Sequence, residues 1–255
     1  MGNDVALKEE SALVSISDAM KADAGSGFEN VTQEDVALPF LSLIQSLSPQ
    51  RTKGDPKWIE GAEEGLLFNT VSESLYDYVS IVPCAYNKVF MEWVPRDHGG
   101  GLVGIYDRTE VNHRIESKDG LKITSVAGND IVPTMQFFCV QVDEDAKIIL
   151  DRFLISMSIS QIKVGKKWLS RMQTIMAPGE TPYPVPMYGQ VWKMSSCLEK
   201  NASGQPYYNW SPSFERPLDD TAVYLACKQF HFDVVGGEAK VDYGKSDIGE
   251  DDLPF

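Results

Sequence analysis

Four basic residues recur with helical spacing in the middle of the chain. Lys163, Lys167 and Arg171 stand at i, i+4 and i+8, and Lys166 lies beside them. On an α-helix, with about 100° between successive residues, these side chains share one face, and apolar residues such as Trp168 occupy the opposite face. A row of cations of this kind is suited to contact phosphate groups. The alternative is that these residues only solvate the outer face of an amphipathic helix.

Aromatic side chains form the second group that could contact a nucleic acid, because bases stack on ring faces. Residues 205–210 read Gln-Pro-Tyr-Tyr-Asn-Trp in a segment with strand character, so successive rings alternate between two faces. Trp58, beside Lys57 and near Lys53, also pairs a ring with cations. Most rings in a β-barrel are core residues, so we expect only about two or three to touch bases. The stacking candidates are Tyr207, Tyr208, Trp210, Trp192 and Trp93.

No pattern typical of catalysis or of metal binding is present in the sequence. Residues 165–167, Gly-Lys-Lys, lack the earlier Gly and the following Ser or Thr of a phosphate-binding loop. The three histidines and four cysteines have no metal-ligand spacing, and we interpret the cysteines as reduced core residues. The acidic clusters 143–145 and 219–220 could hold magnesium in a nuclease, although a hairpin tip and a helix start explain them more simply. We expect no enzyme activity, no cofactor and no metal.

The negative charge of the chain is concentrated in its two terminal segments. The formal net charge of -14 argues against a nucleic-acid partner, because phosphate contacts come from Lys and Arg. Residues 1–40, however, hold eight acids and two bases, and residues 233–255 hold seven acids and two bases. The body, residues 41–232, has a net charge of only -3, and its stretch 152–179 contains five bases and no acid. The body is therefore compatible with a phosphate partner.

The last residues combine acidic groups with an apolar tip. Residues 233–255 contain too few apolar residues to fold by themselves, so this segment should be disordered until a partner binds it. A terminal Phe presents a ring and a carboxylate together, which suits an apolar pocket rimmed by Arg or Lys, and the acids add long-range steering. The residues predicted to bind a partner are Asp247, Glu250, Asp251, Asp252, Leu253, Pro254 and Phe255.

These groups need a scaffold, and the chain from residue 76 onward has a β pattern. The expected strands are 79–83, 88–94, 102–106, 135–142, 148–157, 189–198 and 205–210, with a turn at 201–204 between the last two. Amphipathic residues 158–176 predict a helix between strands, residues 218–229 a final helix, and residues 32–47 a short helix interrupted at Pro39.

The order of these elements predicts a mainly β (α+β) fold. Antiparallel strands, one intervening helix and a final hairpin are typical of an OB-fold, a small Greek-key β-barrel that binds oligonucleotides. Another β-barrel or a sandwich with a crossover helix would give a similar pattern. The predicted domains are a flexible acidic arm at 1–30, the OB-fold-like domain at 31–232 and a disordered acidic tail at 233–255.

The C-terminal tip resembles that of bacterial single-stranded-DNA-binding proteins, a short acidic run closing in Ile-Pro-Phe, with Leu253 where Ile is usual. It is similar, more loosely, to the acidic, Phe-ended tails of phage single-stranded-DNA-binding proteins. The body lacks the long Gly, Gln and Pro-rich linker of the bacterial proteins and looks closer to the phage proteins in segments such as 38–41, 188–192 and 207–210.

This resemblance implies an OB-fold protein that coats single-stranded DNA, largely independently of sequence, during phage DNA replication, recombination or repair. The tail would then recruit a polymerase, helicase, primase or nuclease. It would also compete with DNA for the basic surface, since a tethered acidic segment has a high effective concentration.

Two other functions remain open from the sequence. One is a protein-interaction or assembly factor that does not bind DNA, and the other is a metal-dependent nuclease or nuclease accessory. No apolar run is long enough to cross a membrane and no signal peptide is recognisable, so we expect a location in the cytoplasm, that of the bacterial host for a phage protein. The sequence leaves the oligomeric state open, a homo-oligomer included.

Overall fold

The computed structural model describes residues 16–23, 26–31, 38–119, 122–177, 179–201 and 203–237. The chain divides into two compact units, Met1–Val36 and Ala37–Phe255. The described part of the first unit contains helix α1, Ile16–Ala22, which has no buried residue. The strands and the remaining helices belong to the second unit.

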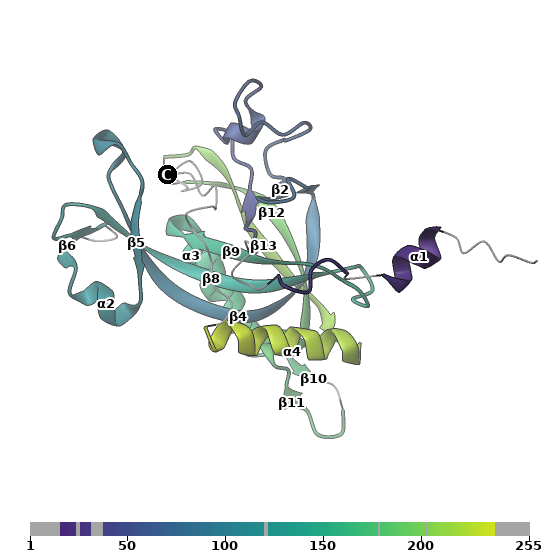
Figure 1. The fold of residues 1–255 in the computed structure, drawn as a ribbon. Coiled ribbons are helices and arrows are strands. Elements are labelled where there is room, and N and C mark those ends of the chain that lie inside the picture. The colour runs from purple at the N-terminus through teal and green to yellow at the C-terminus, as the bar shows by residue number, and fades with distance from the viewer. Residues whose placement is uncertain are drawn as a thin grey trace, which may run out of the picture. The chain divides into compact units, whose positions relative to one another are not determined.

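The second unit is built on a curled antiparallel sheet that forms a half-barrel (Figure 1). Its five long strands lie in the order β13-β12-β4-β8-β9, with each neighbouring pair antiparallel. The prediction of a mainly β fold is confirmed, and a bulge between Pro83 and Ala85 joins two expected strands into one long β4. The bounds are β4 Tyr78–Trp93, β8 Asp130–Val142, β9 Ile149–Ser158, β12 Gln190–Lys200 and β13 Pro206–Pro217.

Both faces of this sheet are buried, because successive side chains of a strand point to opposite sides. On β8, Phe137 belongs to the core on the α3 side, where it packs with Trp168, whereas Phe138 belongs to the core on the other side with Phe230. Helix α3, Ile162–Met172, lies on the concave side of β4, and helix α4, Thr221–Val235, runs beneath the convex side (Figure 1). The two helices therefore cover opposite faces.

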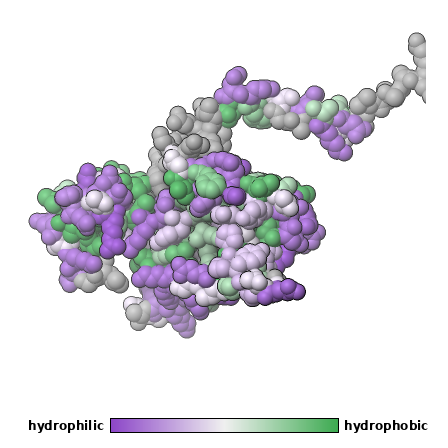
Figure 2. Space-filling model, turned by 90° about the horizontal axis from the view of Figure 1, so that it is seen from below, coloured by the Kyte–Doolittle hydropathy of each residue, from purple (hydrophilic) through white to green (hydrophobic). Residues whose placement is uncertain are grey.

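Helix α4 begins at a side-chain cap and ends inside the segment predicted as the acidic tail. The carboxylate of Asp220 accepts a hydrogen bond from the Val223 amide at 2.9 Å, which satisfies a free N–H of the first turn. Val234 is buried in the convex-side core, so residues 233–235 complete the helix. Viewed from the α4 side, the molecule shows apolar side chains scattered among hydrophilic ones (Figure 2). Leu225 and Phe232 are among the exposed apolar residues.

A small lobe is inserted between β4 and β8. It consists of β5 Leu102–Tyr106, α2 Arg108–Asn112, β6 Ile115–Asp119 and β7 Lys122–Ser125. The lobe has a core of its own around Phe90, Val111 and Ile123. This third core explains how a long insertion can be ordered beside the main sheet.

The expected helix over residues 32–47 is wrong for its described part. Leu41–Leu43 form strand β1, which pairs with β2, Leu67–Asn69, and β2 pairs with β3, Leu75–Tyr76. In an extended strand the side chains of Leu41 and Leu43 point the same way, and both enter the core on the α3 side. A two-stranded sheet, β10 Met176–Ala177 with β11 Tyr183–Pro184, follows α3. None of the described helices is both long and apolar enough to cross a membrane.

Candidate functional site

Helix α3 separates its basic and apolar residues as the sequence predicts. Trp168 and Met172 are buried, while Lys163, Lys167 and Arg171 are exposed, as is Lys166. The expected helix over 158–176 is shorter in the structure and follows a 3-10 turn, Ile159–Gln161.

Gly165 allows the close approach of α3 to the sheet. A Cβ added there would stand 2.9 Å from Met135 Sδ and 3.2 Å from Met157 Sδ, so a larger residue would require these methionine side chains or α3 to shift. The cationic face of α3 is therefore held close to the body of the half-barrel.

A groove of about 460 Å³ lies between α3 and the β12–β13 hairpin. Lys163, Lys167 and Arg171 contribute cations from the helix side, and Glu199 contributes a carboxylate from β12. Lys166 is not part of the lining. Successive cations on α3 are separated by about 6 Å along the helix axis, since each residue rises 1.5 Å. The groove thus places a regularly spaced row of positive charge along one wall.

The Glu199 carboxylate is held by three donors at one end of this groove. Its Oε2 accepts hydrogen bonds from Tyr207 Oη at 2.6 Å and Asn209 Nδ2 at 3.0 Å, and Lys163 Nζ lies 2.8 Å away. Lys163, followed by Tyr207 and Asn209, lowers the pKa of Glu199 from 4.5 to about 2. Burial and the Glu199 carboxylate in turn raise the pKa of Tyr207. The carboxylate is therefore ionised at neutral pH and neutralises Lys163.

The other cations of α3 remain available. Arg171 donates a long hydrogen bond of 3.4 Å to the carbonyl of Pro212, and its guanidinium lies 5.3 Å from the centre of the Trp192 ring. Within the part of the chain that the structure describes, neither Lys166 nor Lys167 forms an ion pair. A bound anion would meet Lys167 and Arg171 without having to displace another anion.

Three of the rings predicted to stack on bases are core residues. Trp192 is 0% exposed, Trp210 3% and Trp93 5%, so none presents a ring face to solvent. The sequence pattern could not distinguish these residues, since a large ring on a strand fits the core and the surface equally well. We correct the prediction for all three. Tyr207 and Tyr208 are half-buried and remain candidates.

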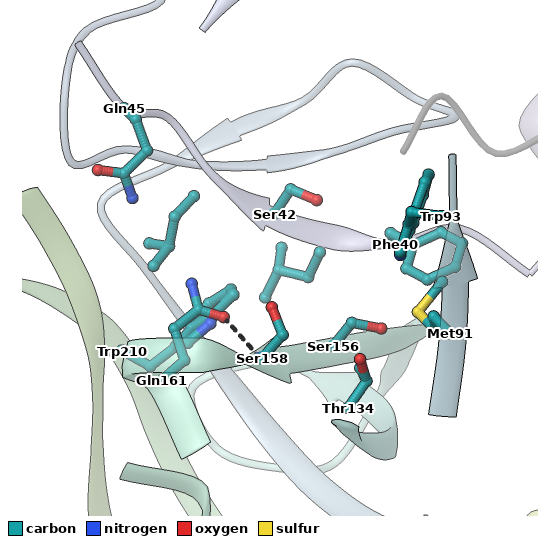
Figure 3. A pocket seen from close by; sticks show the side chains of 12 residues that line it. Phe40, Ser42, Gln45, Met91, Trp93, Thr134, Ser156, Ser158, Gln161 and Trp210 are labelled. Atoms are coloured by element: carbon teal, nitrogen blue, oxygen red, sulfur yellow. Dashed lines mark hydrogen bonds between the residues drawn. The ribbon is translucent and has the colours of Figure 1, made fainter. Parts of the chain in front are cut away.

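Trp93 and Trp210 both line a second, smaller pocket beside β1 and β9, at its opposite ends (Figure 3). Its volume of about 50 Å³ is room for a few water molecules and not for a nucleobase. Ser156 and Gln161 line it, and the Gln161 side chain accepts a hydrogen bond of 3.4 Å from the Ser158 amide (Figure 3). Within the described ranges, Trp93 Nε1, Trp210 Nε1 and Ser156 Oγ have no hydrogen-bond partner. The pocket is small and has a mixed polar and apolar lining, so it does not restore the two indoles as stacking platforms.

A family model described as Pam3 phage gp34-like protein matches residues 8–240. The chain belongs to this family. No curated protein and no solved structure matches it. The family places the chain among phage proteins, and the role of the groove has to be argued from its geometry.

In this gp34-like chain one acidic cluster closes a hairpin, and the other lies at the start of α4, where Asp220 is the N-cap. Asp143 Oδ1 accepts hydrogen bonds from the amides of Lys147 and Ile148, both at 2.7 Å, which closes the β8–β9 hairpin. These amides lower the pKa of Asp143, with the Ile148 amide the largest cause. Asp219 forms an ion pair with Lys147 at 3.2 Å. These contacts account for both acids without a metal.

The partner-binding residues predicted for the gp34-like chain, 247–255, lie outside the described residues. Sequence reasoning missed Glu199, which lines the groove, and the buried Asn209, whose amide donates to the Glu199 carboxylate. A signal was present, because a turn at 201–204 places Glu199 opposite Tyr207 on the paired strands, and the structure has this pair.

Proposed function

We propose that the chain binds single-stranded DNA, largely independently of sequence, with the strand lying in the groove between α3 and the β12–β13 hairpin. The observation that carries this proposal is the row of Lys163, Lys167 and Arg171 along one wall of an open groove. Its axial spacing of about 6 Å is comparable with the separation of successive phosphates in an extended single strand. In a chain of net charge -14, such a local surplus of cations is a specific feature.

The strand order of the half-barrel supports the same proposal. The order β13-β12-β4-β8-β9, with α3 between β9 and β12 in the chain, agrees with that of an OB-fold, whose partly open barrel binds oligonucleotides. We therefore propose that the half-barrel is an OB-fold variant. In such a fold, the lobe between β4 and β8 would be an enlarged loop. The turn at 201–204 would be an exposed loop between the last two strands.

The rings that remain exposed limit how bases can be held. Tyr207 and Tyr208 are half-buried, and Trp58 is 39% exposed with Lys53 Nζ 5.9 Å from its ring centre. These three rings are only partly exposed, so we propose that phosphate contacts supply most of the affinity. We therefore expect binding to be strongly weakened by salt.

A titration with oligo-dT and with a matched duplex, each over a salt series, tests the proposal. Contacts of α3 with about three phosphates predict a slope of log K against log salt of about -2 for the single strand. Binding of the duplex should be weaker at each salt concentration. If the protein shows no salt-dependent preference for the single strand, the proposal fails and an assembly factor without DNA binding is favoured. Magnesium-dependent cleavage of either DNA, lost in an Asp143→Asn variant, would instead favour a nuclease.

We further propose that residues 247–255 recruit replication, recombination or repair proteins and compete with DNA for the groove. Deleting these residues removes four acids, so the affinity for oligo-dT should rise severalfold at low salt and the partner contact should disappear. The measurement compares oligo-dT binding by the full chain and the truncated chain. An unchanged or weaker affinity after the deletion would refute the competition.

A further inference from the structure

The end of the groove near the β12–β13 turn contains an oxyanion site that the protein fills itself. Three different side chains, from α3 and β13, direct donors at the single oxygen Oε2 of Glu199, at distances of 2.8, 2.6 and 3.0 Å. The donors are the Lys163 ammonium, the Tyr207 hydroxyl and the Asn209 amide. A carboxylate at the surface can be solvated by water, so it does not require three convergent protein donors, one of them charged.

The same donors would suit a phosphate oxygen. Ammonium, hydroxyl and amide N–H groups all form short, charge-assisted hydrogen bonds to anionic oxygens, whether the anion is a carboxylate or a phosphate. Lys163 also belongs to the row of cations that continues along α3 to Lys167 and Arg171. A strand held by Lys167 and Arg171 would have its next phosphate at the position of the Glu199 carboxylate, one helical repeat away.

We propose that Lys163, Tyr207 and Asn209 form a phosphodiester subsite, and that Glu199 occupies this subsite in the free protein until a DNA phosphate displaces it. This inference rests on the proposed function and assigns a specific role to one end of the groove. Exchange of one anion for another leaves the donors satisfied, so no buried donor is left without a partner at any stage. The Glu199 side chain is 28% exposed, which gives the displaced carboxylate a path to solvent.

The self-occupied subsite has a consequence for affinity and for selectivity. Because Lys163 is already neutralised, the groove binds an isolated anion weakly there, and only a chain of phosphates anchored at Lys167 and Arg171 competes at high effective concentration. Glu199 therefore lowers the affinity for any single strand and disfavours small free anions. Glu199 thus affects which anions the groove binds, and it takes no part in a reaction.

The test is Glu199→Gln, which removes the charge and keeps the shape of the side chain. We expect about fivefold to tenfold tighter binding of oligo-dT at low salt, because the phosphate no longer has to displace a carboxylate from Lys163. The matched control is Glu180→Gln, an exposed carboxylate outside the groove lining, which should change the affinity little. Thermal unfolding of each variant shows whether it is folded at the temperature of the titration.

The double variant Lys163→Gln/Glu199→Gln separates masking of the subsite from general repulsion. If Glu199 acts by holding Lys163, most of the gain disappears in the Lys163→Gln background. An equal gain in that background, an equal gain from Glu180→Gln, or weaker binding by Glu199→Gln overturns the proposal.

A titration with pyrophosphate distinguishes failure of this subsite from failure of the DNA-binding proposal. The side-chain amide resonances of Asn209 should shift in Glu199→Gln and stay unchanged in the wild-type chain at the same concentrations. If oligo-dT does not bind the wild-type chain, the proposed function fails, whereas the pyrophosphate result still decides whether the three donors form an anion site. No shift in Glu199→Gln overturns the subsite itself.

Discussion

Helices α3 and α4 cover opposite faces of the same half-barrel and present different outer surfaces. α3 buries Trp168 and Met172 and exposes four cations, whereas α4 buries Val223 and Phe230 and exposes apolar side chains with a single lysine, Lys228, in its length. Each helix has an inner face that the sheet dictates. The outer faces are under no such constraint, and the cationic one, that of α3, is the face to which we assign the proposed contact with DNA phosphates.

The comparison is reinforced by what surrounds each helix. The outer face of α3 borders an open groove with a fixed carboxylate at one end, and the outer cations line it. On the α4 side Leu225 and Phe232 are 56% and 53% exposed, in a surface of mixed hydropathy (Figure 2). Two helices with equal structural roles can therefore differ in function, and substitutions placed in pairs on α3 and α4 test this difference.

The largest effect on stability is expected when one large core side chain beneath each helix is replaced by alanine. Trp168 packs against Phe137 and Trp192, with ring centres 4.6 and 5.9 Å apart, and Phe230 is similarly buried under α4. Trp168→Ala and Phe230→Ala should each lower the free energy of unfolding by about 3–5 kcal/mol, measured by urea denaturation.

Among variants that remain folded, only Trp168→Ala should weaken oligo-dT binding, because it removes the support of the cationic helix. Equal losses of binding in both variants would show that the groove depends on the whole fold and not on α3.

The next largest effect concerns the exposed cations. Lys167→Gln/Arg171→Gln should weaken oligo-dT binding by about 2 kcal/mol at low salt and make the salt slope shallower by about 1.4, because two phosphate contacts are lost. Lys228→Gln on α4 is the control and should change neither quantity. A loss of affinity in the control as large as that in the double variant would contradict the assignment of the strand to the α3 side.

A smaller effect is expected from acid. The pKa of Glu199 in the folded chain is about 2, below its ordinary value of 4.5, so the folded state binds this proton less readily than the unfolded state. The stabilisation is complete above about pH 5 and is lost as the pH falls toward 2.

The full shift corresponds to about 3 kcal/mol, which solvent screening at a partly exposed carboxylate reduces to about 1 kcal/mol. Urea denaturation at pH 7 and pH 3 should show that Glu199→Gln loses part of this acid sensitivity. An identical pH dependence in the variant and the wild type would mean that the donors do not hold Glu199 in solution.

The smallest effect is expected on the outer face of α4. Leu225→Ala and Phe232→Ala remove side chains that are more than half exposed, so each should change the free energy of unfolding by no more than about 0.5 kcal/mol. A loss above about 1 kcal/mol that depends on protein concentration would show that this face is covered by another copy, and sedimentation velocity would detect the assembly.

Periodicity predicted the larger elements well and the individual contacts poorly. The spacing of Lys163, Lys167 and Arg171 predicted which face of a helix would be exposed, because the helical repeat alone fixes that face. The strand pattern predicted the long strands, although a bulge in β4 and the pairing of β1 with β2 were not visible in it.

The rings show where prediction from the sequence fails. Trp192, Trp210 and Trp93 have the residue type that stacks on bases and also the type that fills cores, and only the packing of several strands places all three inside. Glu199 shows the opposite error, because sequence reasoning did not select it. In the structure its carboxylate contacts Lys163, which lies on a helix far away in the chain.

The sequence by itself determined the class of fold, the cationic face of α3 and the separation of the acidic terminal segments from a nearly neutral body. These properties depend on local period and composition, which a chain carries whatever its tertiary structure. The tertiary structure alone decided that α3 faces the β12–β13 hairpin across a groove, that three indoles are buried and that Lys163, Tyr207 and Asn209 converge on Glu199. These relations join residues far apart in the chain, and only the curling of the sheet brings them within bonding distance.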